Sequence, residues 1–161
     1  MRLGVVMVVL AMGAGPVGAR AAASPDPFCN DLMALAAKAR PGGKPIPFSL
    51  RHLGPHQGVA CGYEKMPEAR QLCRRYQEHP HFEFADGYPR DVEACLKEQG
   101  AKLLVTADGP DSGFADDRPM VTRLLGELPD GLRFSLKRTS REDILPDAAD
   151  YDLEITRSAR P

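Results

Sequence analysis

The segment at residues 79–84, HPHFEF, contains the side chains that come nearest to a metal site. His79, His81 and Glu83 alternate, so they would share one face if the segment is extended. Imidazole and carboxylate ligands together suit zinc or copper. The opposing interpretation is an irregular loop with exposed histidines, because Pro80 interrupts the segment. The sequence predicts no cofactor, and zinc or copper at these three residues is the metal hypothesis that it leaves open.

The four cysteines, Cys29, Cys61, Cys73 and Cys95, are widely spaced. Their spacing matches neither the paired ligands typical of a structural zinc site nor the C-x-x-C motif of thioredoxin-like enzymes. In an oxidising compartment they predict two disulfides. The preferred pairing is Cys61 with Cys95 and Cys29 with Cys73, which would tie a hairpin to the third helix and the first helix to the second. A bridge from Cys73 to Cys95 across a helical hairpin is the main rival.

No nucleophile stands in a context that activates it. None of the serines available as nucleophiles lies in a G-x-S-x-G elbow. These serines are Ser49, Ser112, Ser135 and Ser140. The disulfide interpretation removes the cysteines from consideration as nucleophiles. No catalytic residue is predicted, and a small hydrolase stays the last of three functional hypotheses.

Arginines form the other candidate site, a patch that would bind an anion or a partner protein. Its members are Arg51, Arg70, Arg74 and Arg75. Acidic neighbours such as Glu68 and Glu78 dilute the positive charge, so a solvated helix face is the alternative interpretation.

The overall charge argues against nucleic acid as a partner. The chain has 21 basic and 22 acidic residues, and no basic run is longer than Arg74-Arg75. A nucleic-acid binder typically has a concentrated basic face. The absence of Trp and an aromatic content of 6% also argue against surfaces that stack on bases or sugars.

The first residues have the three-part pattern of a secretory signal peptide. Arg2 precedes an apolar run over residues 3–12, and small residues follow. The preferred cleavage site is before Ser24, with a second option before Arg20. The apolar run is too short to span a membrane. The expected mature protein is therefore a soluble secreted or periplasmic domain, residues 24–161, with no membrane anchor and a loose tail from about residue 157.

Three helices and a hairpin are expected in the first half of the mature chain. Apolar residues recur at helical spacing after Asp26-Pro27 and predict a helix that ends near Arg40. Alternating residues over 46–50 and 59–63 predict a β-hairpin. Two further helices should start near Pro67 and near Pro89.

The second half is expected to form strands, over residues 102–107, 120–125, 132–136 and 151–156. If the last two strands are antiparallel neighbours, Arg133 and Lys137 on one outer face meet Asp152 and Glu154 on the other. This arrangement favours that pairing and a solvated outer face. Strand edges at 120–125 or 150–156 are candidates for dimerisation.

These elements predict an α+β domain: an antiparallel sheet of about five to six strands, with about three helices packed on one face and disulfides as staples. The leading functional hypothesis is an exported, non-enzymatic protein that binds another protein, as inhibitors and immunity proteins do. The alternative is a periplasmic metal-binding protein that uses His79, His81 and Glu83. The hydrolase described above is the second alternative.

Overall fold

The computed structural model describes residues 26–53, 58–63, 65–78, 87–110, 119–140 and 148–159. Within them the helices are α1 (Pro27–Ala36), α2 (Pro67–Glu78) and α3 (Gly87–Glu98), and the strands are β1 (Ile46–His52), β2 (Val59–Tyr63), β3 (Lys102–Pro110), β4 (Pro119–Glu127), β5 (Leu132–Ser140) and β6 (Ala149–Arg157). The predicted α+β class is confirmed.

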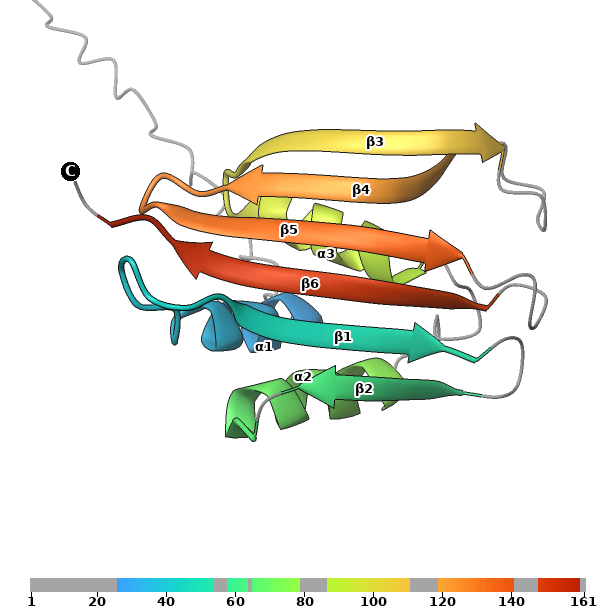
Figure 1. Ribbon diagram of the computed structural model, residues 1–161, viewed down its shortest axis with the longest axis horizontal. Helices are drawn as coiled ribbons and strands as arrows, with labels where there is room; N and C mark the ends of the chain where they lie inside the picture. The colour runs from blue at the N-terminus through green and yellow to red at the C-terminus, as the bar shows by residue number, and fades with distance from the viewer. Residues whose placement is uncertain are drawn as a thin grey trace, which may run out of the picture.

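The six strands form one antiparallel sheet in the order β2-β1-β6-β5-β4-β3. The last strand of the chain, β6, therefore lies inside the sheet between β1 and β5. The three helices pack on one face, with α2 behind β2 and α3 behind the β3–β4 side (Figure 1). None of these three helices lies over the opposite face.

Buried and exposed residues alternate along the strands, and this alternation gives the sheet one apolar face toward the helices and one face toward solvent. Phe48 and Leu50 of β1, and Leu153 and Ile155 of β6, point toward the helices and are buried. The residues between them point away from the helices, as the strand period of two requires. The helices contribute the other half of the core through Leu32, Leu72 and Leu96, which are completely buried.

Helix α1 begins where the sequence predicts and ends earlier. Asp26 Oδ1 accepts a hydrogen bond from the backbone N–H of Phe28 at 3.0 Å, with Pro27 in the first turn. The helix ends at Ala36 rather than near Arg40, because the chain then tightens into short turns, in which Ala39 N donates to Ala36 O at 3.0 Å. The last turn is thus replaced by a tighter one.

An aromatic cluster fills the centre of the core. The ring of Tyr88 lies edge-on to the rings of Tyr76, Tyr151 and Phe28, at centroid distances of 5.1, 5.7 and 6.2 Å respectively. Such contacts contribute beyond the buried area alone. The Tyr88 hydroxyl is buried and has no hydrogen-bond partner among the residues that the structure describes. Burial raises the pKa of both Tyr76 and Tyr88 above the ordinary tyrosine value.

All four cysteines form disulfides, but the predicted pairing is wrong. The bridges are Cys29–Cys95, between α1 and α3, and Cys61–Cys73, between β2 and α2. The prediction assumed that α3 covers the β1–β2 hairpin. Instead α2 folds back on β2, directly after it in the chain, while α3 lies beside α1 and the β3–β4 side.

The last two strands are antiparallel neighbours, as predicted, with Lys137 opposite Asp152. At the start of the expected tail, two backbone hydrogen bonds hold residues 157 and 158: Ser158 N donates to Gly131 O at 2.9 Å, and Gly42 N donates to Arg157 O at 3.0 Å. Segments 120–125 and 150–156 are not edges either, since β4 and β6 each have two neighbours.

The predicted signal peptide lies outside the residues that the structure describes. Among the helices of the described ranges, none has the length and apolar character that a membrane span requires.

Candidate binding surface

The face of the sheet that carries no helix is called the open face below. It is formed by side chains from every strand: Pro47, Ser49, Arg51, Ala60, Gly62, Lys102, Leu104, Thr106, Arg123, Leu125, Glu127, Arg133, Ser135, Lys137, Asp150, Asp152, Glu154 and Thr156. Because the strands alternate, each of these residues except Thr106 is one position away from a residue that lies in the core or packs against it. The core therefore fixes where each open-face side chain stands.

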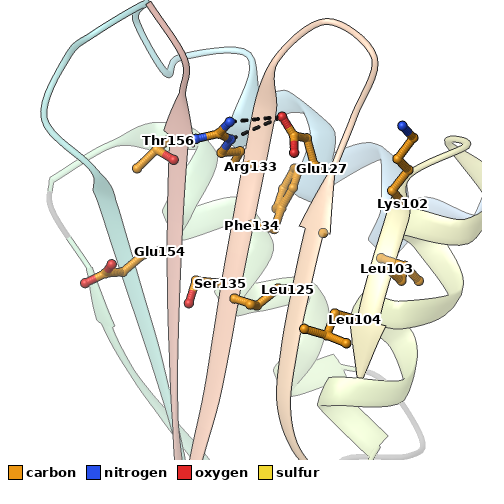
Figure 2. A pocket seen from close by; sticks show the side chains of 11 residues that line it. Lys102, Leu103, Leu104, Leu125, Glu127, Arg133, Phe134, Ser135, Glu154 and Thr156 are labelled. Atoms are coloured by element: carbon orange, nitrogen blue, oxygen red, sulfur yellow. Dashed lines mark hydrogen bonds and ion pairs between the residues drawn. The ribbon is translucent and has the colours of Figure 1, made fainter. Parts of the chain in front are cut away.

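A hollow of about 440 Å³ lies on the open face across β3, β4, β5 and β6. Figure 2 shows Leu104 and Leu125 side by side in it, with the linked Arg133 and Glu127 side chains at one end. Leu104 is opposite Leu125 in the β3–β4 register. The hollow thus combines an apolar floor with a charged rim.

Two further hollows, of about 640 and 330 Å³, continue across β5, β6, β1 and β2. Small side chains make this depression: Ser49 donates to Gly62 O at 3.3 Å, and a Cβ on Gly62 would lie 2.5 Å from Ser49 Oγ. Ser135 and Glu154 line both the first and the second hollow. They form the ridge between the apolar and the small-residue regions.

Ion pairs neutralise part of the open face. Arg51 Nε lies 2.8 Å from Asp150 Oδ1, and Arg133 NH2 lies 3.2 Å from Glu127 Oε1. Arg133 therefore pairs with β4 rather than with β6, which the sequence predicted as the source of its acidic neighbour. Exposed pairs of this kind contribute about 0.2–1 kcal/mol each.

Glu154 and Lys102 keep their charge available. Within the described ranges neither side chain has an ion-pair partner. The cross-strand neighbours of Glu154 are Pro47 on β1 and Ser135 on β5, and both are uncharged. A carboxylate between two hollows can therefore receive a cationic side chain from a partner without first losing an ion pair.

The predicted arginine patch is divided between two sides of the molecule. Arg51 lies on the open face, whereas Arg70, Arg74 and Arg75 are on α2, behind the sheet. Arg75 is moreover engaged by Asp31 of α1, with Nε 3.1 Å from Oδ2. The four residues do not form one site.

The predicted metal ligands His79, His81 and Glu83 lie outside the described residues. Among those that are described, no group of three or more His, Cys, Asp or Glu side chains is arranged to hold a metal ion. His52 is 1% exposed and points into the core. Ser49 and Ser135 lie on the other face of the sheet from it.

Sequence reasoning described the outer face of the last two strands but not the open face as a site. The hollow at Ser49 and Gly62 arises only when β2 and β1 pair in one particular register. The alternation of small residues at Ala60 and Gly62 was the available signal. A scan against protein-family models, a search of curated proteins and a search of solved structures each gave no match.

Proposed function

We propose that this protein is an exported, non-enzymatic binding module that holds a partner protein against the open face of its sheet. One observation carries the proposal: three adjoining hollows follow one another across this face, and the ridge between two of them carries the carboxylate of Glu154, which has no ion-pair partner among the described residues. A surface that spans all six strands fits the size of a protein partner better than that of a small ligand.

The chemistry of the face indicates what the partner offers. Leu104 and Leu125 would accept apolar side chains, and Glu154 would accept a lysine or arginine beside them. Protein interfaces typically have such an apolar centre with a charged rim. The rigid sheet beneath reduces the entropy lost on binding, as in inhibitor and immunity proteins that bind with preformed surfaces.

Two disulfides support the export part of the proposal. Such bridges persist in oxidising compartments and are rare in the cytosol. They agree with the signal-peptide pattern at the N-terminus. The preferred compartment is the periplasm or the extracellular space.

Site-specific photocrosslinking in the native host tests the proposal. A photoreactive amino acid replaces Ser135 on the open face or, as the control, Arg74 on the outer side of α2. We expect a protein adduct from position 135 and none from position 74. An adduct from position 74 alone would support the arginine hypothesis and overturn the open-face proposal.

The captured protein is then purified and titrated against matched charge reversals. Glu154→Lys should raise the Kd at least about tenfold, equivalent to about 1.4 kcal/mol. Arg74→Glu should leave the Kd unchanged. An unchanged Kd for Glu154→Lys contradicts the proposal, whatever the crosslinking shows.

A further inference from the structure

Two neighbouring residues of β3 expose large apolar side chains. Leu104 is 64% exposed and Val105 is 37% exposed. Every other large hydrophobic side chain that the structure describes is less exposed than these two. Consecutive strand residues point to opposite faces of a sheet. Leu104 is thus on the open face and Val105 on the helix side.

Consecutive residues that are exposed on opposite faces of a sheet are expected in an edge strand, because no adjacent strand covers either side chain. Among the described strands, β3 pairs with β4 alone and is the last strand of the sheet. A body lying on the open face could cover Leu104 but would leave Val105 in water. A strand placed beside β3 would cover both and would also bond the free backbone groups of the edge.

The other edge of the sheet is protected. Strand β2 has five residues, against nine for β3, and α2 lies behind it. Gln77 Nε2 of α2 donates to the Val59 carbonyl of β2 at 3.0 Å, and the Cys61–Cys73 bridge fixes the strand to the helix. The contrast identifies β3 as the edge that is open to pairing.

We propose that β3 pairs with β3 of a second copy of this chain, antiparallel, about a two-fold axis at Leu104. The stretch before the first register irregularity is Lys102–Thr106, with the sequence KLLVT. The order of polar and apolar residues in this stretch, polar-apolar-apolar-apolar-polar, is the same in both directions from Leu104. Antiparallel pairing about that residue places Leu104 opposite Leu104 of the partner subunit.

The same register gives each residue that flanks Leu104 a compatible cross-strand partner. Leu103 faces Val105 of the partner subunit on the helix side, and Lys102 faces Thr106 of the partner subunit on the open side. No like charges meet, and each apolar side chain meets another, as cross-strand stabilisation requires. The two subunits would share one continuous sheet, joined by an isologous interface.

Sedimentation equilibrium of the oxidised full chain tests the dimer. From about 1 µM to about 1 mM, the mass should rise from one chain toward two. Leu104→Lys places two ammonium groups opposite each other at the axis and should weaken association at least about tenfold. The control is Leu125→Lys, one strand inward on the same face, which should leave association unchanged.

Cysteine substitutions test the register. Leu104→Cys should crosslink with itself, because directly opposite residues of an antiparallel pair have Cα atoms about 4.5–5.5 Å apart, within the range of a disulfide. Lys102→Cys and Thr106→Cys should each fail to crosslink alone and should crosslink when mixed. Peptide mapping would verify that the two native bridges are intact.

A mass of one chain at every concentration overturns the proposal, as does self-crosslinking of Lys102→Cys or Thr106→Cys as efficient as that of Leu104→Cys. The dimer and the open-face partner both involve Leu104, so the two proposals are separated at Glu154, which lies on β6 and away from the β3 edge. Loss of the dimer would leave the Glu154→Lys experiment unaffected, and failure of that experiment would leave the dimer standing.

Discussion

At the scale of single residues, Gly126 of β4 allows α3 to approach the sheet. A Cβ at this position would lie 2.8 Å from Leu96 Cδ1 and 3.1 Å from Leu103 Cδ2. Leu96 is completely buried, so a shift of its side chain would have to displace other residues of a closely packed core. Gly62 on the open face has a similar short approach, but there the neighbour is the hydroxyl of half-buried Ser49.

This contrast predicts different costs for the same substitution. Gly126→Ala should lower the free energy of unfolding by about 1–3 kcal/mol, because it overpacks the core. Gly62→Ala should change it by less than about 0.5 kcal/mol, since the Ser49 hydroxyl can rotate away into solvent. Urea denaturation of both variants measures the difference. Equal effects would mean that the α3–β4 contact is not tight.

At the scale of elements, each disulfide joins two neighbours in space. The Cys61–Cys73 bridge closes a separation of 12 residues and holds α2 against β2, whereas Cys29–Cys95 closes a separation of 66 and joins α1 to α3. A longer closed loop restricts the unfolded chain more strongly. The two bridges should therefore contribute unequally to stability.

Removal of each bridge measures this inequality. The double substitution Cys29→Ala and Cys95→Ala should cost about 4 kcal/mol, against about 3 kcal/mol for Cys61→Ala with Cys73→Ala. Denaturant unfolding at neutral pH compares the two variants with the oxidised protein. A larger loss from the short bridge would show that it acts in the folded state, by fixing β2, rather than through the unfolded chain.

The sequence predicts the elements well because their signals are local. The alternation of Phe134 and Leu136 is sufficient to identify β5, and Asp26-Pro27 is sufficient to start α1. The cysteine pairing depends on which helix covers which strand, and no local pattern contains that information. The open face could not be predicted from a local pattern either, because Ser49 and Gly62 meet only in the assembled sheet.

At the scale of the whole molecule, the buried tyrosines link stability to alkaline pH. Burial raises the pKa of Tyr76 and Tyr88 in the folded state above the ordinary value of 10.0. Above about pH 10 the unfolded chain releases these protons while the folded protein keeps them. The resulting stability is complete below pH 10 and is lost as the pH rises toward the folded-state values.

The variant Tyr88→Phe isolates one of these groups. At neutral pH its stability should equal or exceed that of the natural protein, because the Tyr88 hydroxyl is buried and no described residue forms a hydrogen bond with it. Above pH 10 its stability should fall less steeply. Thermal melts from pH 7 to about pH 11 give both results. An unchanged alkaline slope would contradict the burial of this hydroxyl.

The position of β6 determines when the domain can fold. This strand ends at Arg157, close to the C-terminus, yet it joins β1–β2 to the rest of the sheet. Until it has been synthesised, the hairpin and the strands β3–β5 have no common partner, so the sheet can be completed only after the last of its six strands is available.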